Sequence, residues 1–465
     1  MPFTIFSTKS HSYLYDRPEN KVVEIDKEMY DALKGKQGNE IRQAAISKMQ
    51  AKGLCMDNSI ETIEHPFTKD IELHLNGRME QVALQVTQNC NLRCEYCVYS
   101  GKYNNRTHSN RRMDLSVALS AVDFLMEHSY LSDRVVIGFY GGEPLLEIEL
   151  IHKVVEYVKA KYSTKAVRFA ITTNATLLTE EVAEYFDQNH FIVMVSLDGP
   201  KDLHNKHRCF IDGHGSFDLV IRNLENIQKN HPDLYATMST NTVLSPDIDF
   251  KSVEDFLIKD NIIGKLNSKV SLLSDTGLDE KIKFDEKTAA YQQAGEVAQM
   301  LGMIGEVEVP EQYLIMGDYQ TTLKETYDGL TIGNYKVKSA APSGPCIVGT
   351  SRSFCDVNGR LFPCEKVNES KEMCIGNIFE GFDIEAVRRI LNIAQTTEAE
   401  CKKCWAFPFC TACVAASLGG NGLSRKKRLS KCANIRHAAQ ERLRNVMILQ
   451  EYGYDFNQYD IQKGE

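Results

Sequence analysis

The sequence lacks long hydrophobic runs and lacks an excess of positive charge. No stretch of about 18 apolar residues occurs in the 465-residue chain, which excludes an ordinary transmembrane helix and gives no sign of a membrane partner. The N-terminus has neither the basic start nor the apolar core of a secretory signal peptide, so we expect a cytoplasmic protein. The formal net charge is −9, which argues against nucleic acid as a partner because phosphate contacts need a basic face.

The chain is long enough for two to four domains, and its 43% hydrophobic content supports substantial cores. The one dense basic run is Ser424–Arg428. Such a run is usually a solvated loop, but it can also meet an acidic peptide or offset the charge of an anionic cluster.

Cysteine is abundant, with 14 residues in the chain. In a reducing compartment thiols stay free, so this number favours metal ligation over a disulfide scaffold. Cys90, Cys94 and Cys97 stand in C-x3-C-x2-C spacing directly after the apolar strand candidate Val82–Val86. Three thiolates leave one iron of a [4Fe–4S] cluster free to bind a small molecule, whereas four close the coordination sphere. A zinc knuckle or a group of buried free thiols is the alternative.

This spacing, with Tyr96 just before the third cysteine, resembles the signature of the radical S-adenosylmethionine (SAM) enzymes. The resemblance implies that Cys90, Cys94 and Cys97 hold a [4Fe–4S] cluster whose open iron is chelated by SAM. It further implies that an electron from the cluster cleaves SAM to a 5′-deoxyadenosyl radical, which abstracts hydrogen from an unactivated C–H bond.

Between residues 82 and 275 apolar strands alternate with helical segments, which is typical of βα units on a parallel sheet. The expected strands are Val82–Val86, Val135–Tyr140, Val167–Ile171, Ile192–Val195, Met238–Val243 and Lys269–Leu273. The expected helices are Leu115–Met126, Ile151–Tyr162, Glu180–Asn189, Phe217–Gln228 and Ser252–Lys259. Six repeats predict an α/β fold with a partial (β/α)6 barrel, the usual radical SAM fold, in which ligands bind at the carboxyl ends of the strands.

Three motifs at those strand ends resemble the SAM-binding segments of the family. Gly141-Gly142-Glu143-Pro144 resembles the motif that holds the SAM amino group, and Thr173–Thr176 resembles a Thr-Asn-Gly-Thr segment with Ala175 in place of glycine. A serine and an arginine at the spacing of Ser196 and Arg208 contact SAM in related maturases, whereas Asp198 between them could simply cap the next element. The implied cofactor-binding residues are Tyr96, Gly141, Gly142, Glu143, Asn174, Ser196 and Arg208.

The N-terminal region has a different pattern. Three short strands are expected at Phe3–Ser7, Ser12–Asp16 and Val22–Ile25, followed by helices at Lys27–Leu33, with Asp26 as N-cap, and Glu40–Lys52. This small winged-helix-like unit resembles the leader-peptide recognition element (RRE) of enzymes that modify ribosomally made peptides (RiPPs). There an extended leader adds a strand to the exposed sheet edge. A plain accessory domain is the alternative.

A second cysteine array begins at Cys346 and includes two close pairs within residues 401–413, a strong metal signal. It resembles the SPASM domain, which carries two auxiliary [4Fe–4S] clusters. The resemblance implies Cys346, Cys364 and Cys413 as ligands of the first cluster and Cys401, Cys404, Cys410 and Cys432 as ligands of the second. Cys355 is the natural fourth ligand of the first cluster, and Cys374 is another candidate. If Cys355 does not ligate, an iron stays open to a substrate thiolate. Zinc is the alternative here too.

These patterns divide the chain into a recognition domain at 1–75, a radical SAM partial barrel at 76–300, a bridging region at 301–340 and a SPASM domain at 341–465 with a C-terminal helix near Ile435–Leu449. This order resembles the maturases that make thioether crosslinks in the cysteine-rich sactipeptides and ranthipeptides. It implies a radical SAM oxidoreductase with SAM and three [4Fe–4S] clusters as cofactors. The implied partners are a precursor peptide bound through its leader and a flavodoxin or ferredoxin as electron donor. Which carbon is linked, Cα, Cβ or Cγ, stays open.

The nearest alternative is an anaerobic sulfatase-maturating enzyme, which oxidises cysteine or serine to formylglycine. Those enzymes generally carry an aspartate base where this chain has Glu365, and generally lack the N-terminal domain. Both departures favour the peptide maturase, with Glu365 as a candidate catalytic base. Peptide epimerisation and carbon–carbon crosslinking use the same scaffold. A non-catalytic iron–sulfur scaffold would explain the cysteines but not Gly141–Pro144, Asn174 or Ser196.

Overall fold

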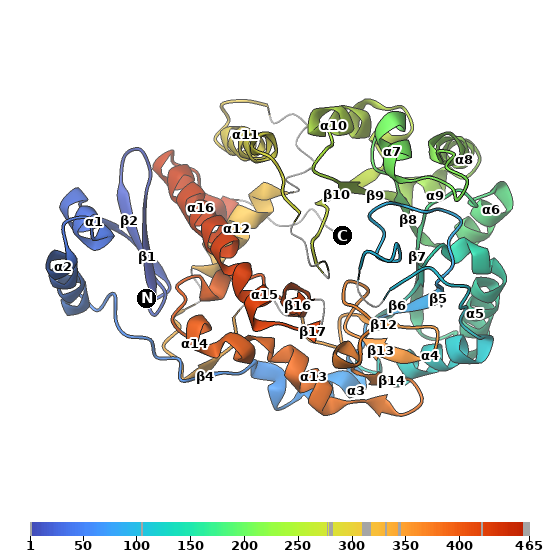
Figure 1. The fold of residues 1–465 in the computed structure, drawn as a ribbon, viewed down its shortest axis with the longest axis horizontal. Coiled ribbons are helices and arrows are strands. Elements are labelled where there is room, and N and C mark those ends of the chain that lie inside the picture. The colour runs from blue at the N-terminus through green and yellow to red at the C-terminus, as the bar shows by residue number, and fades with distance from the viewer. Residues whose placement is uncertain are drawn as a thin grey trace.

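The computed structural model describes residues 2–103, 106–276, 278, 282–308, 318–330, 333–342, 346–419 and 422–458. An N-terminal sheet with two helices lies at one end of the molecule, and a large sheet covered by helices lies at the other (Figure 1). Parts of the expected bridging region (309–317 and 331–332) and of the C-terminal domain (343–345, 420–421 and 459–465) lie outside the described residues.

The N-terminal unit has the elements that its sequence predicted. Strands β1 (Phe3–Ser7), β2 (Ser12–Asp16) and β3 (Lys21–Ile25) form an antiparallel sheet with β2 in the middle, followed by α1 (Lys27–Lys34) and α2 (Asn39–Ala51). The Asp26 carboxylate accepts a hydrogen bond from the Met29 N–H at 2.7 Å, so the predicted N-cap is confirmed. Leu14, Leu33 and Met49 join in the small core between sheet and helices.

The central sheet confirms the predicted α/β pattern. Its six parallel strands pair in chain order: β5 (Gln81–Thr87), β6 (Arg134–Gly141), β7 (Ala166–Thr173), β8 (Ile192–Ser196), β9 (Ser239–Leu244) and β10 (Asn267–Leu272). The predicted helices are α4 (Leu115–Glu127), α5 (Ile148–Lys161), α6 (Glu180–Gln188), α8 (Phe217–Asn230) and α10 (Phe250–Lys259). Two short helices, α7 (Lys201–His207) and α9 (Pro232–Thr237), were not predicted.

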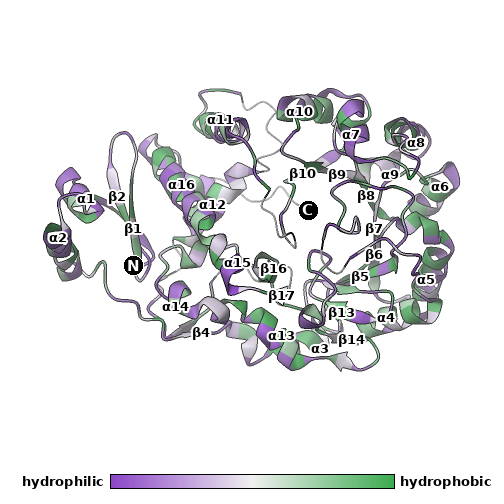
Figure 2. Ribbon diagram, viewed as in Figure 1, coloured by the Kyte–Doolittle hydropathy of each residue, from purple (hydrophilic) through white to green (hydrophobic). Residues whose placement is uncertain are grey.

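The helices around this sheet carry hydrophobic residues on part of their surface and hydrophilic residues on the rest (Figure 2). Their apolar side chains pack on the sheet, where strand residues such as Val82, Leu84 and Ile137 are fully buried. Strands buried on both faces need this helical cover, and their carboxyl ends are left for the loops.

The C-terminal region continues the central sheet, which the sequence did not predict. Strand β12 (Ser353–Cys355) pairs in parallel with β5, and β13 (Arg360–Phe362), β14 (Gly376–Asn377) and β15 (Gly381–Phe382) follow in antiparallel order. The sheet therefore has ten strands and is open, with β10 and β15 at its two edges. Because β12 borders β5, the second cysteine array begins beside the strand that carries the first.

The remaining elements join the ends of the chain. The long helix α16 (Cys432–Glu451) packs on α12 (Tyr319–Gly329) and on β1, and Leu443 of α16 lies in one apolar cluster with Phe6 and Tyr15. The other described helices and strands are β4 (Thr62–Ile63), α3 (Ile71–Gly77), α11 (Glu286–Met303), β11 (Ser339–Ala340), α13 (Ile384–Leu391), α14 (Glu398–Cys401), β16 (Leu418–Gly419), β17 (Gly422–Leu423) and α15 (Arg425–Ser430). Within the described residues, no helix has the length and apolar character needed to cross a bilayer.

Candidate active site

The cysteine triad, Cys90, Cys94 and Cys97, lies in the loop at the carboxyl end of β5. The charges of Cys94 and Cys97 both act on the pKa of Cys90, so the three thiols are neighbours. Burial raises the pKa of Cys90 to about 12 and that of Cys94 to about 11. Buried thiols of this kind ionise when a metal centre binds them. Backbone N–H groups already point at the sulfurs, from Leu92 to Cys90 at 3.3 Å and from Tyr99 to Cys97 at 3.4 Å.

Gly141 and Gly142 dock this loop onto the end of β6. The Gly142 N–H donates to the Thr87 carbonyl at 2.9 Å, and the Glu143 N–H donates to the Asn89 carbonyl at 2.8 Å. A Cβ at Gly142 would overlap the Asn89 carbonyl oxygen, and a Cβ at Gly141 would overlap that of Thr87. The resemblance assigned these glycines to the binding of the SAM amino group. In the structure, the backbone that approaches them is that of the cysteine loop.

Glu143 is a buried brace between two strand ends. Its carboxylate accepts hydrogen bonds from the Leu145 N–H at 3.0 Å, the Thr173 hydroxyl at 2.7 Å and the Asn174 N–H at 2.8 Å. Burial raises the pKa of Glu143, and these three donors oppose the rise. The side chain thereby fixes the end of β7 against the glycine turn after β6.

Asn174 connects the end of β7 to the loop that carries the triad. Its Nδ2 donates to Oδ1 of Asn91 at 2.9 Å and lies 3.8 Å from the Cys90 sulfur, while its own Oδ1 accepts from the Thr176 N–H at 3.0 Å. The next residue, Ala175, has φ +58°, a left-handed conformation that glycine adopts more readily. This matches the glycine expected at that position.

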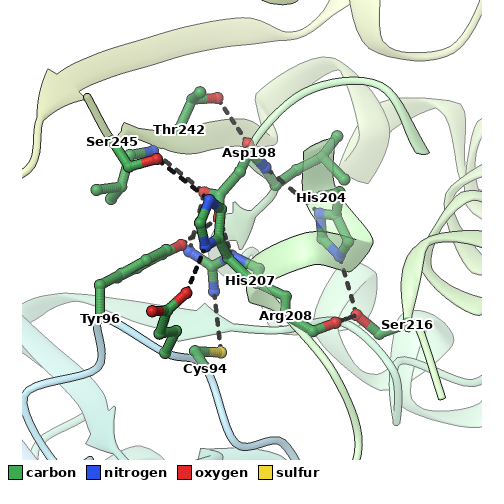
Figure 3. Close-up of polar contacts among 12 residues, drawn as sticks. Cys94, Tyr96, Asp198, His204, His207, Arg208, Ser216, Thr242 and Ser245 are labelled. Atoms are coloured by element: carbon green, nitrogen blue, oxygen red, sulfur yellow. Dashed lines mark hydrogen bonds and ion pairs between the residues drawn. The ribbon is translucent and has the colours of Figure 1, made fainter. Parts of the chain in front are cut away.

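Arg208 and Asp198 form a buried ion pair beside the triad (Figure 3). The Arg208 guanidinium lies 5.4 Å over the Tyr96 ring, and its Nη1 lies 4.0 Å from the Cys94 sulfur. The Tyr96 hydroxyl donates to the same Asp198 carboxylate. The sequence analysis left open that Asp198 could cap the next element and did not assign it this role; the signal was a carboxylate two residues beyond the end of a strand. Ser196 is the last residue of β8 and is half-buried.

Asp198 and Arg208 each stabilise the charged form of the other. Burial opposes ionisation of Asp198, but the Arg208 charge and the hydrogen bonds from Arg208 and Tyr96 hold its pKa below the usual value. For Arg208, burial likewise opposes the charged form, but Asp198, Tyr96 and Cys94 raise the pKa well above its usual value. The fixed guanidinium partly offsets the rise in the pKa of Cys94 that burial causes. Arg208 is therefore placed to balance the negative charge of a thiolate.

His204, one turn before Arg208, has a structural environment. Its Nε2 lies 2.9 Å from the Ser216 hydroxyl, and its Nδ1 accepts from the Asp198 N–H at 3.4 Å. Burial lowers the pKa of His204 to about 4, so the ring is neutral near pH 7. It supports the backbone of Asp198 from behind.

The C-terminal cysteines fall into two sets. In the first set, Cys346, Cys364 and Cys413, the charges of the other two thiols act on the pKa of Cys364, which burial raises to about 11. The second set, Cys401, Cys404, Cys410 and Cys432, lines a single cavity of about 240 Å³.

Two candidate ligands lie apart from these sets. Cys355 is fully buried in the main hydrophobic core, its thiol donates to the Asp356 carbonyl at 3.6 Å, and Asp356 supplies the one charge found to act on it. We expected Cys355 as the fourth ligand of the first set; in the structure its thiol is bonded within the core, and that ligation stays a prediction. Cys374 lines another cavity of about 990 Å³ and donates to the Gly376 carbonyl at 3.3 Å.

Glu365 directly follows Cys364 of the first set. Its Oε1 accepts from Arg352 at 2.7 Å, and its Oε2 is buried with no hydrogen-bond partner among the described residues. The charges of Glu365, Cys97 and Cys364 all act on Tyr140, whose pKa burial raises to about 12. Tyr140 directly precedes the glycine turn. Because the charges of Cys97 in the triad and Cys364 in the first set both act on it, this tyrosine is near both groups of cysteines. Arg106 ties the two regions together by donating to the Glu365 and Val367 carbonyls at 2.9 and 2.8 Å.

The donor sets fit iron–sulfur clusters better than a single metal ion. Among the described residues, no three His, Cys, Asp or Glu side chains converge closely enough to ligate one ion, as a zinc site requires. The thiolates of a [4Fe–4S] cluster bind different irons and so stand further apart. All-sulfur donors, N–H groups aimed at the sulfurs and nearby guanidinium groups suit such an anionic centre.

Comparison with known proteins identifies the central domain. Residues 84–258 match the sequence model of the radical SAM superfamily, so the chain contains a radical SAM domain. An uncharacterized protein, MJ0907, of Methanocaldococcus jannaschii is 40% identical over 26% of this chain and 39% of its own length. A cysteine-type anaerobic sulfatase-maturating enzyme of Clostridium novyi is 23% identical over 70% of this chain and 84% of its own.

A solved structure, native anSMEcpe with bound AdoMet and Cp18Cys peptide, has a TM-score of 0.58 at 20% identity. It covers 80% of this chain, and this chain covers 99% of it. The likeness shows that the two proteins share a mixed α/β fold over most of this chain.

Proposed function

We propose that the protein is a radical SAM maturase that links a cysteine sulfur of a ribosomally made precursor peptide to a carbon of another residue in that peptide. The match of residues 84–258 to the radical SAM superfamily supports an enzyme of that superfamily. A peptide as substrate is supported by the C. novyi relative, named for maturation of a sulfatase, and by the anSMEcpe structure with its bound peptide. The thioether bond is the part of the proposal that this chain's own cysteines support.

In this proposal the triad holds the SAM-binding cluster, and the first and second sets hold two auxiliary clusters. When bound, SAM and its cluster supply the 5′-deoxyadenosyl radical for hydrogen abstraction, and the auxiliary clusters accept the electron released as sulfur and carbon join. Asn174 and Arg208 hold the triad and balance its charge, and the Gly141–Gly142 turn keeps its loop against β6. Tyr96 and Ser196 would complete the strand-end surface on which SAM would lie, and the buried Glu143 would hold the strand ends beneath it. A flavodoxin or ferredoxin would supply electrons.

The observation that carries the thioether assignment is the number of thiols in the first set. Cys346, Cys364 and Cys413 are neighbours, whereas Cys355 is packed in the core and bonded to a backbone carbonyl. Three thiolates leave one iron of a [4Fe–4S] cluster without a protein thiolate. A substrate cysteine can bind there and be held for bond formation.

Glu365 is then placed to take the proton of that substrate thiol. Its Oε2 is buried and lacks a hydrogen-bond partner within the described residues, while Arg352 fixes its other oxygen. A base must lie within hydrogen-bond reach of the proton that it removes, and Glu365 directly follows Cys364 of the first set. Tyr140 is near both groups, since the charges of Glu365 and of Cys97 in the triad both act on its pKa.

The N-terminal sheet offers one edge to a leader peptide. The edge at β1 is covered by α16, because Gln440 donates to the Ile5 carbonyl at 3.0 Å and Arg444 donates to the Ser7 carbonyl at 3.1 Å. In the described part of the chain no strand pairs with the outer edge of β3. We therefore propose that the leader adds as a strand along β3, as peptide-recognition sheets commonly do.

Formylglycine formation is the second candidate. It is favoured by the fold shared with anSMEcpe and by a carboxylate directly after Cys364. An epimerase or a carbon–carbon crosslinking enzyme would also be compatible with the radical SAM domain, but no feature of the cysteine sets favours either.

The decisive test is an anaerobic reaction of reconstituted enzyme, SAM and reductant with a co-expressed cysteine-rich precursor peptide. Mass spectrometry should find a loss of two hydrogen atoms per crosslink, with cysteines that resist both reduction and alkylation. Formylglycine in a sulfatase peptide, with the precursor unchanged, would overturn the thioether assignment. Hydrogen loss with all cysteines still alkylatable would mean that other residues are joined.

The open position of the first set is tested by counting iron. Cys364→Ala should lose about four of about twelve irons per chain, whereas Cys355→Ala should retain them all. In the Cys355→Ala enzyme, added precursor should still change the electron paramagnetic resonance (EPR) spectrum of an auxiliary cluster. Loss of a cluster in Cys355→Ala would instead make Cys355 a ligand and close the site.

A further inference from the structure

Arg17 connects the N-terminal sheet to the second set. It follows the last residue of β2, is fully buried, and its Nη1 donates to the carbonyls of Lys402 and Cys404 at 2.7 and 3.0 Å. Its Nη2 donates to Asn58, and its guanidinium lies 5.6 Å from the centre of the Phe407 ring. A side chain from the beginning of the sequence therefore holds the backbone between Cys401 and Cys404.

This buried cation has no carboxylate within ion-pair distance in the described part of the chain. The neighbouring Asp16 carboxylate is taken up by the N–H groups of Glu19, at 2.9 Å, and Cys55, at 2.6 Å. The guanidinium instead lies against the backbone of the Cys401–Cys404 loop, with neutral carbonyl oxygens as its acceptors. A buried charge is costly without a counter-charge, so the arrangement favours a negative centre at the cysteines.

Arg428 repeats the arrangement from another side of the second set. It is 2% exposed, and its neutral acceptors are the Thr397 hydroxyl at 3.2 Å and the Ala412 carbonyl at 3.1 Å. Its charge acts on the pKa of both Cys410 and Cys432. The basic run that the sequence singled out thus ends in a buried residue that faces the cysteines.

Aromatic contacts make the connection rigid. Tyr15 of β2 packs against Trp405 and Phe409, with ring centres 6.2 and 5.4 Å apart, and both partners lie in the loop between Cys404 and Cys410. Figure 1 shows the N-terminal sheet lying against α16, the helix that begins at Cys432. The N-terminal sheet therefore contacts the second set in two places. One is the loop between Cys404 and Cys410, and the other is α16, the helix that begins at Cys432.

We propose that Arg17 is a positioning residue of the second set, which fixes the Cys401–Cys404 loop and supplies counter-charge to the cluster there. The N-terminal unit is then a wall of this cluster site as well as a peptide-binding module. The inference rests on the proposed function only in assuming that the second set binds a cluster. It adds a residue outside the cysteine motifs and a direct link between the unit proposed to bind the leader and the redox site.

The test compares four variants by iron content and by EPR-monitored redox titration without substrate. Cys404→Ala reports whether the second set holds a cluster at all. Arg17→Met should either release about four irons or shift the potential of one auxiliary cluster to more negative values, since a lost cation disfavours the reduced state. Arg17→Lys keeps the positive charge but not the planar guanidinium that bonds Lys402, Cys404 and Asn58 together. The variant should therefore contain the full iron after reconstitution but release it to a chelator several-fold faster than the wild-type protein.

Arg444→Met is the matched control, because Arg444 of α16 also contacts the N-terminal sheet, but its partner there is the Ser7 carbonyl and not the Cys401–Cys404 loop. It should match the wild-type protein in iron, potential and chelation rate. Wild-type behaviour of both Arg17 variants, with a cluster lost in Cys404→Ala, would overturn the role of Arg17 and leave the proposed function standing. Full iron in Cys404→Ala would mean that the second set holds no cluster. That result would overturn both the role of Arg17 and the proposed assignment of an auxiliary cluster to the second set.

Discussion

The carboxylate of Asp198 accepts two hydrogen bonds from the Arg208 guanidinium, at 2.8 and 3.2 Å, and both side chains are almost fully buried. The pair comes from two ends of one loop region, since Asp198 follows β8 and Arg208 follows α7. The third guanidinium nitrogen of Arg208, Nη1, lies near the Cys94 sulfur, so the ion pair orients a cation toward the triad.

Asp198→Asn should therefore weaken both the fold and the SAM site. Removing one partner of a buried pair costs about 3 kcal/mol or more, because the other charge is left buried. We expect a clear fall in the anaerobic unfolding temperature and a drop of at least about tenfold in 5′-deoxyadenosine formation. The control is Asp247→Asn, whose ion pair with Lys206 is 45% exposed on the Asp247 side and contributes about 1 kcal/mol or less. Equal behaviour of the two variants would contradict the role of the pair.

Gly142→Ala should disturb the triad without touching a cysteine. A Cβ there overlaps the Asn89 carbonyl, which belongs to backbone that cannot move without moving Cys90. We expect loss of the SAM-binding cluster, measured as about four irons fewer per chain, and little 5′-deoxyadenosine. Gly329→Ala is the control, because a Cβ at that helical glycine meets nothing within 4 Å. Wild-type iron in Gly142→Ala would show that the loop tolerates the shift.

The regular elements were predictable because each depends on local sequence. The alternation of strands and helices from β5 to β10 follows from apolar runs and helical periodicity, and Asp26 is a cap by its position. The pairing of β12 with β5 is different, because it joins Ser353 to Val82, two residues that are far apart in the sequence. The three residues of β12 are too few for a sequence pattern to predict which strand they pair with.

The site was predictable where a motif carries it and not where burial decides. The cysteine spacing and the glycine turn identified the loops, yet Cys355 reads in sequence like any other cysteine of the array. Its side chain is buried because the whole of β12 lies inside the extended sheet, a position that a three-residue segment does not reveal. Asp198 and Arg17 were missed for a related reason: their partners lie far away in sequence or look like ordinary caps and loops.

His204 should make the stability of the protein fall in acid. Its pKa in the fold is about 4, below the usual 6.5, so between these values the unfolded chain binds more protons than the folded one. Stability therefore rises with pH across this window and is lost as pH falls from about 6.5 toward 4. The full effect is about 3 kcal/mol, since each pKa unit corresponds to about 1.4 kcal/mol.

The measurement is the unfolding temperature at pH 7.5 and pH 5.5 for the wild-type protein and for His204→Gln. The wild-type protein should lose more stability than the variant on going to the lower pH. His231→Gln is a suitable control, because the His231 ring lies near the carboxylates of Glu180 and Asp187 on the surface of the sheet's helices. An identical pH response in His204→Gln and the wild-type protein would contradict a neutral buried ring.

Glu365→Gln should separate radical generation from product formation. The triad and its SAM site do not depend on this carboxylate, so 5′-deoxyadenosine should still form at a rate within about threefold of the wild type. Loss of a general base costs about 10²-fold or more, so crosslinked peptide should fall by at least that factor. The exposed residue Glu380 provides the control variant, Glu380→Gln, which should leave both rates unchanged. A parallel fall of 5′-deoxyadenosine and product would place Glu365 in SAM binding instead, and an unchanged product rate would remove it from the chemistry.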